Sequence, residues 1–148
     1  MAKTRSLYSV HPSILRFQGR GAETPEEYLA NAPRHVDAMF GGAKAALRPL
    51  YDRLLDLGLG IAADVKACPC QTIVPLFRNH AFAQIKPATR TRIDLGFALG
   101  PRKAEGRLID TGGYAKKDRI THRIPISSAA DIDDEVQRWL RLAYEEDV

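Results

Sequence analysis

The spacing of apolar residues divides the chain into a helical beginning, a β-rich middle and a C-terminal helix. From about Pro33 to Leu57, apolar side chains recur at intervals of three and four, which is the period of one helix face. Before them, the stretch TPEE offers Thr24 as an N-cap and Pro25 for the first turn, and so predicts a short helix that ends near NAP. Pro49 should bend the longer helix.

Alternation of apolar and polar residues follows after the glycines at 58 and 60. It predicts strands in DVKAC, TIVPLF, AFAQIK, RIDLGFAL and HRIPIS, with a further short strand at RLI. Pro75 cannot donate to a ladder, so its strand is expected at an edge or beside a bulge. The stretch SSAADIDDEVQRWLRLAYEE predicts the last helix, capped by Ser127 or Ser128, with Trp139 on its buried stripe.

The order of these elements predicts an α+β fold. We expect a single domain with a mainly antiparallel sheet of about four to six strands, with two N-terminal helices and one long C-terminal helix packed on one face. The 148 residues fit one domain. We assign residues 1–22 to an N-terminal arm and residues 23–148 to the α+β domain.

The stretch FAQIKPATRTRIDLGF, residues 82–97, predicts a hairpin with a basic outer face. Placing Ile85 opposite Ile93 keeps the apolar residues of both strands on one face. The same register places Lys86 opposite Arg92, and like charges in that position repel. We interpret this pair as the edge of a surface that attracts anions.

Composition and cysteine content indicate the compartment. The chain is 45% hydrophobic and 27% charged, as in ordinary globular proteins. No apolar run approaches the roughly 20 residues that span a bilayer, and the N-terminus lacks the apolar stretch of a signal peptide. Cys68 and Cys70 are too close for an unstrained disulfide, so two reduced thiols are expected. These features predict a cytoplasmic protein with no membrane partner.

The formal charge of +4 is unevenly distributed. Residues 78–123 contain eleven bases and four acids, whereas residues 129–148 contain seven acids and two bases. A polarised surface of this kind steers charged partners. The candidate anion-binding residues come from the hairpin and from the glycine-containing loop TGGYAKKDR: Lys86, Arg90, Arg92, Lys116, Lys117 and Arg119. The expected partner is an anionic small molecule or a nucleic acid, with Phe82 and Tyr114 available for stacking.

A second set of residues supports an alternative, in which the protein is an enzyme. A cysteine beside a histidine and a base can act as a thiolate nucleophile. The candidate pocket contains Cys68, Cys70, Arg78, His80, Tyr114 and His122. One C-x-C pair with scattered histidines does not match the paired ligands of structural zinc, so no metal site is assigned. We also assign no cofactor and no catalytic residue. A structural or self-association domain is the third alternative, and the oligomeric state is left open.

Three stretches also carry a family resemblance: DVKACPCQTIVPLFRNHAFAQIKPATRTRIDLGFAL, RLIDTGGYAKKDRITHRIPISS and DDEVQRWLRLAYE. Over about residues 33–148, the chain resembles the bacterial domain of unknown function family numbered fifty-six fifty-five. Some members carry the label "predicted transport protein", and related domains follow other modules, including nuclease-like ones. The resemblance implies an accessory binding role, and it supplies no catalytic residues.

Overall fold

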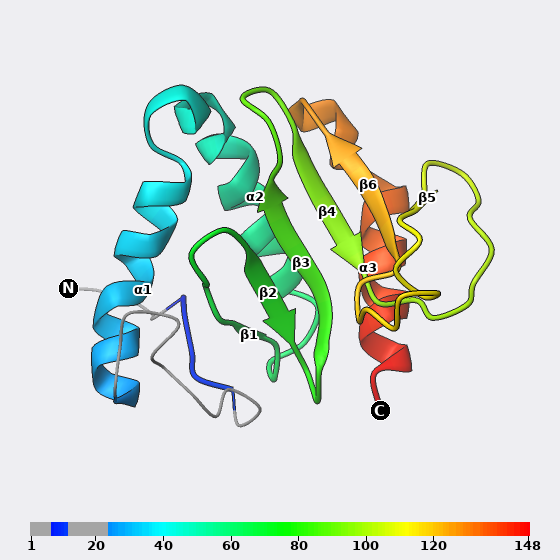
Figure 1. Ribbon diagram of the computed structural model, residues 1–148, viewed down its shortest axis with the longest axis horizontal. Coiled ribbons are helices and arrows are strands. Elements are labelled where there is room, and N and C mark those ends of the chain that lie inside the picture. The colour runs from blue at the N-terminus through cyan, green and yellow to red at the C-terminus, as the bar shows by residue number, and fades with distance from the viewer. Residues whose placement is uncertain (1–6, 12–23) are drawn as a thin grey trace.

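The computed structural model describes residues 7–11 and 24–148. Within them lie three α-helices and a six-stranded antiparallel sheet with the strand order β1-β2-β3-β4-β6-β5 (Figure 1). The predicted α+β class with a C-terminal helix is therefore confirmed. None of the helices in this part of the chain is long and apolar enough to cross a membrane.

The N-terminal helices begin as predicted but divide at a different place. Helix α1 (Pro25–Met39) is capped by Thr24, whose Oγ1 accepts a hydrogen bond from the Glu27 amide at 3.1 Å. The helix continues through Pro33, so the predicted end near NAP is wrong. It stops before Gly42, which has a φ of +56°, a conformation that glycine adopts without strain. The 3₁₀ helix η2 (Gly42–Leu47) then leads into α2 (Arg48–Leu59).

Pro49 lies in the first turn of α2 and not inside a long helix. A proline there removes no helical hydrogen bond, because the first amides have no partner within the helix. The prediction of one long helix that bends at Pro49 is therefore wrong, because a new helix, α2, begins at Arg48. At the C-terminus, Ser128 caps the 3₁₀ helix η3 (Ala129–Asp131), while Asp133 caps α3 (Asp134–Glu146). Trp139 is buried, as predicted.

All six strands lie within or overlap the segments predicted from alternation. They are β1 (Lys66–Ala67), β2 (Val74–Phe77), β3 (Ala81–Pro87), β4 (Ile93–Phe97), β5 (Ile109–Asp110) and β6 (His122–Ile126). The register of β2 with β3 shifts between Leu76 and Phe77, so the irregularity expected beside Pro75 is present. The Pro75 carbonyl still accepts a hydrogen bond from the Cys68 amide at 3.1 Å.

The hairpin of β3 and β4 has a different register from the one predicted. Ile85 pairs with Leu95 and Lys86 pairs with Asp94, so the predicted pairing of Ile85 with Ile93 is wrong by two residues. The connection is held by the amides of residues 88 and 89, which both donate to the carbonyl of Arg92. Lys86 therefore lies opposite a carboxylate, and the cross-strand repulsion that we expected does not exist.

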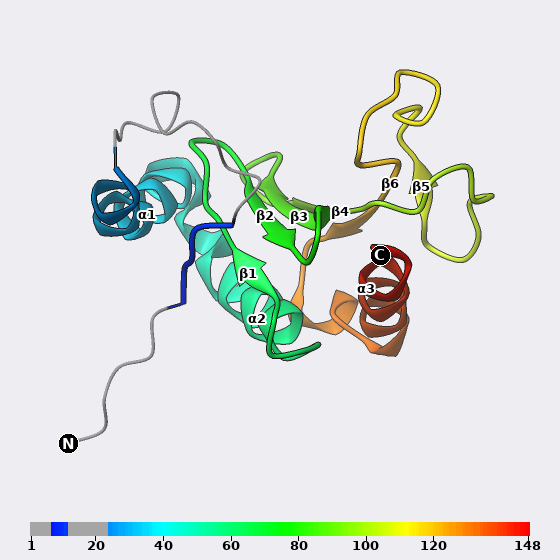
Figure 2. The same cartoon turned by 90° about the horizontal axis from the view of Figure 1, so that it is seen from below.

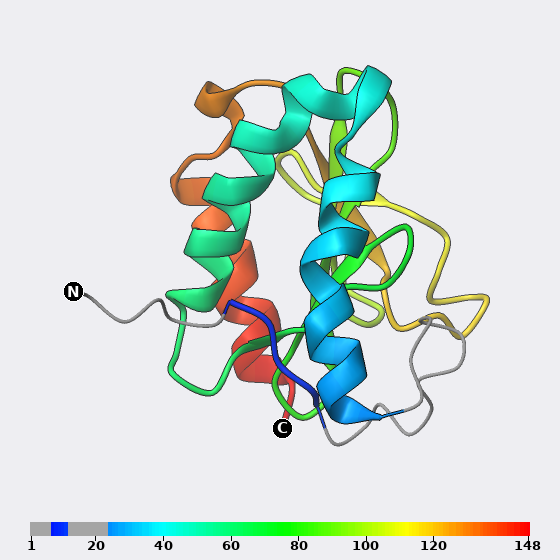
Figure 3. The ribbon, with the colours of Figure 1, turned by 90° about the vertical axis from the view of Figure 1, so that its left-hand side faces the viewer.

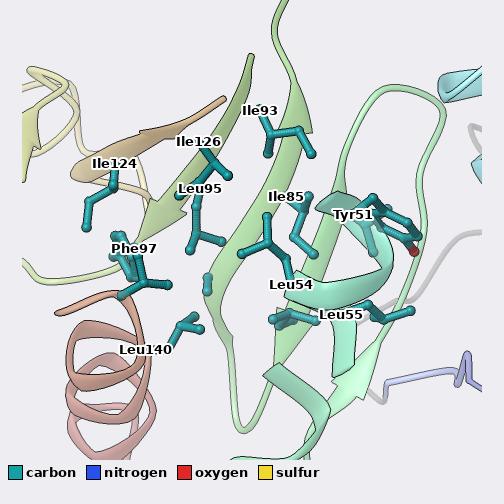
Figure 4. Packing of buried hydrophobic residues seen from close by; sticks show 14 of the residues in the cluster. Tyr51, Leu54, Leu55, Ile85, Ile93, Leu95, Phe97, Ile124, Ile126 and Leu140 are labelled. Atoms are coloured by element: carbon teal, nitrogen blue, oxygen red, sulfur yellow. The ribbon is translucent and has the colours of Figure 1, made fainter. Parts of the chain in front are cut away.

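The two faces of the sheet have different surroundings. Figure 2 shows α2 and α3 on one side of the sheet and the loop that contains β5 on the other. Figure 3 shows the molecule from another direction, with α1 toward the viewer. The covered face holds the core, in which Leu54 and Leu55 of α2 and Leu140 of α3 meet the sheet residues Ile85, Ile93, Leu95, Phe97, Ile124 and Ile126 (Figure 4). None of the helices in the described part of the chain covers the opposite face (Figure 2).

Part of the expected N-terminal arm lies along β1. Tyr8 forms a parallel bridge with Ala67, and its hydroxyl lies 2.8 Å from that of Tyr51. Residues 1–6 and 12–22 of the arm lie outside the described residues. The division into arm and domain therefore stays a prediction.

Candidate anion-binding groove

A groove of about 450 Å³ lies on the sheet face opposite α2 and α3. Its floor is made by β3, β4 and β6, and its wall by the segment that leads into β6. We call it the sheet groove, and its lining residues are Gln84, Lys86, Asp94, Gly96, Thr111, Asp118, Arg119, Ile120 and Arg123. The lining joins three strands with a loop that is distant from β3 and β4 in sequence.

Gly96 allows the wall of the groove to approach its floor. A Cβ atom at this position would lie 2.7 Å from Cγ2 of Ile120, closer than real Cβ contacts, and 3.1 Å from Cγ of Gln84, which is tighter than most such contacts. At Gly113, a Cβ atom would lie 2.2 Å from the carbonyl oxygen of Ile120. The two glycines therefore let Ile120 lie against the sheet, and this contact fixes the loop beside the strands.

The floor of the groove combines one carboxylate with several bases. Asp94 accepts hydrogen bonds from Nε of Arg92 at 2.9 Å and from Nη1 of Arg123 at 3.1 Å. Its side chain is only 15% exposed. Because two arginines hold this carboxylate, Lys86 on the neighbouring strand adds further positive charge to the groove.

Arg119 is fixed at the edge of the groove by the end of α3. Its Nε donates to the carbonyl of Ala81 at 2.9 Å, and its Nη2 donates to Asp147 at 3.2 Å. The Asp147 side chain is 1% exposed and also accepts hydrogen bonds from the amides of Asn79 and His80 and from Nδ1 of His80. Burial by itself raises the pKa of Asp147, but the hydrogen bonds from His80 and the charge of Arg119 outweigh it and hold that pKa below its ordinary value.

The acidic C-terminal segment forms ion pairs with part of the basic segment within the molecule. Arg102 forms an ion pair with Glu146, and Arg107 forms one with Asp133 at 2.7 Å. Arg119 reaches Asp147, as described above. The charge asymmetry seen in the sequence therefore corresponds in part to contacts between the loops and α3, and not only to a polarised surface.

The predicted anion-binding residues are only partly brought together. Lys86 and Arg119 line the sheet groove, and Arg92 contacts Asp94 at its floor. Arg90 lies in the exposed connection between β3 and β4, while Lys116 and Lys117 are exposed in the loop before β6.

Sequence reasoning missed Arg123, which lines the groove and whose contact with Asp94 depends on the pairing of β4 with β6. The alternation of polar and apolar residues in HRIPIS could have placed Arg123 on the polar face of the sheet, but it could not identify Asp94 as its partner. Phe82, expected as a stacking surface, is buried beside Tyr144 at a ring-centroid distance of 5.5 Å, so that expectation is wrong.

The residues of the alternative pocket are dispersed. Cys68 follows the edge strand β1, whereas His122 begins β6, and β2, β3 and β4 separate these two strands. The Cys70 amide donates to the carbonyl of Ile73, just before β2, and the Cys68 amide donates to that of Pro75 near the start of β2, whereas His80 lies three residues beyond the end of this strand. The structure therefore brings neither cysteine beside His80 or His122.

The remaining polar groups of that alternative set have other contacts or lie on the surface. The ring nitrogens of His122 lie 2.8 Å from the Thr121 hydroxyl and 2.7 Å from the Arg102 carbonyl oxygen. Arg78 donates to the carbonyl of Tyr144, and Tyr114 is exposed on its loop. Among the described residues, no group of three or more His, Cys, Asp or Glu side chains is placed to hold a metal ion.

Comparison with known proteins identifies a family but no characterised relative. No curated protein and no solved structure gives a significant match. A family model matches residues 36–147, a range that contains the whole sheet and every lining residue of the groove. The family number inferred from the sequence is thereby confirmed, and the chain belongs to the family described as Domain of unknown function (DUF5655).

Proposed function

We propose that the protein is a binding module that holds an anionic ligand in the sheet groove. The observation that carries this proposal is the convergence of Lys86 from β3, Arg123 from β6 and Arg119 from the loop on one groove. Gln84 and Thr111 add neutral hydrogen-bonding groups to the same lining. Such a set of donors suits a phosphate or carboxylate group.

Lys86 is the base whose charge is most available to a ligand. It is exposed, and no ion pair of Lys86 is present among the described residues. Arg119 and Arg123 are each held by a carboxylate, which orients their guanidinium groups but also offsets part of their charge. A ligand anion would therefore contact Lys86 directly and use the remaining N–H groups of the two arginines.

The composition of the groove favours binding over nucleophilic catalysis. The described residues of the lining include no cysteine or histidine; of its two carboxylates, Asp94 is engaged by two arginines and Asp118 is exposed on the loop. Nucleophilic catalysis by a thiol needs a cysteine beside a histidine or another base. The groove therefore resembles a recognition site more than the catalytic pocket of the alternative hypothesis.

Isothermal titration calorimetry tests this proposal with inorganic phosphate, pyrophosphate and citrate at low ionic strength. We expect saturable binding that weakens with added salt, because the site is open to solvent. Lys86→Ala should weaken it by about tenfold or more, since it removes a charge-assisted hydrogen bond. Lys103→Ala is the matched control, because Lys103 is exposed but lies outside the groove lining. Equal affinity of the two variants would contradict the proposal, as would the absence of binding to all three anions.

A further inference from the structure

The sheet groove continues into a second hollow at each end. Beside the loop, a hollow lined by Gly100, Tyr114, Ala115, Lys117 and Thr121 shares Asp118 and Arg119 with the groove; we call it the loop hollow. Near the break between α1 and α2, a hollow lined by Met39, Lys44, Gln71, Thr72, Pro87 and neighbouring residues shares Lys86 with the groove; we call it the helix-break hollow. The shared side chains make the three hollows one succession.

The ends of this succession are too far apart for one small anion. The helix-break hollow includes Pro87, which pairs with the first residue of β4, whereas the loop hollow includes Gly100, beyond its last residue. Strand β4 alone spans roughly 13 Å at about 3.3 Å per residue. A hydrogen-bonded phosphate lies about 3 Å from its donor, so a single phosphate cannot contact both ends. A ligand that uses the whole succession must carry several anionic groups along its length.

Positive charge is present in each of the three hollows. Lys117 lies in the loop hollow, Arg119 and Arg123 lie in the groove, and Lys86 and Lys44 lie in the helix-break hollow. Nζ of Lys44 donates to the carbonyl of Pro87 at 2.9 Å, which leaves two of its three N–H groups for a ligand. The described residues that line the helix-break hollow include no carboxylate, whereas Asp118 lines both the loop hollow and the groove.

The loop hollow also presents an aromatic ring. Tyr114 is 57% exposed, whereas Phe82 of β3 and Phe97 of β4 are in the core. Lys117 beside it has a φ of +62°, and the amides of Lys117 and Asp118 close a turn on Tyr114 and Gly113. The turn holds an exposed ring and a base at the same end of the groove. An aromatic ring next to a line of phosphate-binding bases is the arrangement by which proteins bind single-stranded nucleic acid.

We propose that the three hollows form one track for single-stranded nucleic acid, in which Tyr114 stacks on a base and the lysines and arginines contact successive phosphates. The inference rests on the proposed function and names the ligand of that site. A double-stranded ligand is disfavoured, because its bases are already stacked on one another and cannot use Tyr114. An acidic peptide has charge but no base to stack, so it would use only part of the track.

Fluorescence anisotropy with labelled oligothymidylates, from a dinucleotide to about twelve nucleotides, tests the inference. Affinity should rise with length until the track is filled. Tyr114→Leu should weaken binding of the longer strands by roughly tenfold without changing the salt slope. Lys44→Gln and Lys117→Asn should each make the slope of log K against log[salt] shallower by about 0.7. Asparagine is chosen at 117 because it tolerates a positive φ.

The controls separate this inference from the proposed function. Lys103→Ala should bind all strands like the unmodified protein, and neither end variant should change the binding of inorganic phosphate to the central groove. If the dinucleotide binds as tightly as the longest strand, the inference is overturned while the proposed function stands. Tighter binding of duplex DNA, or equal binding of poly-glutamate, also overturns it. If neither phosphate nor any strand binds, both proposals fail.

Discussion

Replacement of Asp147 should destabilise the fold far more than a substitution near the end of a helix usually does. The carboxylate is 1% exposed and accepts hydrogen bonds from the amides of Asn79 and His80, from Nδ1 of His80 and from Arg119, at 2.7–3.2 Å. It thus ties the end of α3 to the turn between β2 and β3 and to the loop. Removal leaves several donors without their acceptor, although Arg119 and His80 are themselves about half exposed.

The expected magnitude follows from that geometry. Hydrogen bonds to a charged group contribute about 1.5–3 kcal/mol each, and water can replace part of this at the exposed Arg119 and His80, so we expect Asp147→Ala to lose about 2–4 kcal/mol of unfolding free energy at pH 7. Asp147→Asn should cost roughly 1.5–3 kcal/mol, because the amide still accepts a hydrogen bond but no longer offsets the charge of Arg119. Glu145→Gln is the control, since Glu145 is exposed two residues away, and it should change stability by less than about 0.5 kcal/mol.

Urea denaturation followed by tryptophan fluorescence measures the difference, and its pH dependence gives a second check. Because the pKa of Asp147 lies below its ordinary value of 3.8, its contribution is present above that pH and is lost as the pH falls through the lower folded pKa. The gap between the unmodified protein and Asp147→Asn should therefore be constant from pH 5 to 7 and shrink in stronger acid. A loss below about 1 kcal/mol for Asp147→Ala, or a gap that widens in acid, would refute the reasoning.

Three further changes test the core and the groove. Trp139→Ala should cost about 3–5 kcal/mol, because the side chain is 4% exposed in the core; an unchanged denaturation midpoint with an unchanged slope would contradict this. Gly96→Val should push Ile120 off the sheet, lower stability by about 1–3 kcal/mol and weaken phosphate binding, as calorimetry would show; unaltered binding would mean that the loop wall is not needed. Asp94→Asn should strengthen phosphate binding at low salt and lose this gain at high salt, because it removes the only carboxylate that its two arginine partners contact among the described residues.

The sequence was sufficient for the strands but not for their pairing. Alternation identifies which residues of β3 and β4 share a face, and Ile85 and Ile93 are both buried as expected. A register shift of two residues leaves every side chain on the same face, so burial cannot distinguish the predicted pairing from the observed one. Backbone hydrogen bonds within the connection between β3 and β4 favour the observed register, and the pattern of hydrophobic residues does not reveal these bonds.

The same limit applies to the site. Lys86 and Arg119 could be named from charge and from the loop composition, whereas Arg123 could not, because its partner Asp94 is 29 residues away in the sequence. The alternative pocket failed to assemble for the same reason, since Cys68 and His122 are placed by strand order. The sequence contains several glycines and prolines that can end a helix, and it does not show which of them sets the boundary. Gly42 ended the first helix through its positive φ, while Pro33 remained inside it.

Arginine and lysine side chains make different contacts in this protein, and a count of charges in the sequence does not show the difference. Within residues 7–11 and 24–148, the bases that form ion pairs with carboxylates are arginines, together with His80. The planar guanidinium fork suits a fixed carboxylate, whereas a lysine ammonium is strongly hydrated and mobile. The arginines therefore join the loops to α3, and the charge left for a ligand lies on lysines such as Lys86 and Lys117. Ligand affinity should accordingly respond to salt more steeply than stability does, because the lysines are exposed while Asp94 and Asp147, which hold three of those arginines, are largely buried.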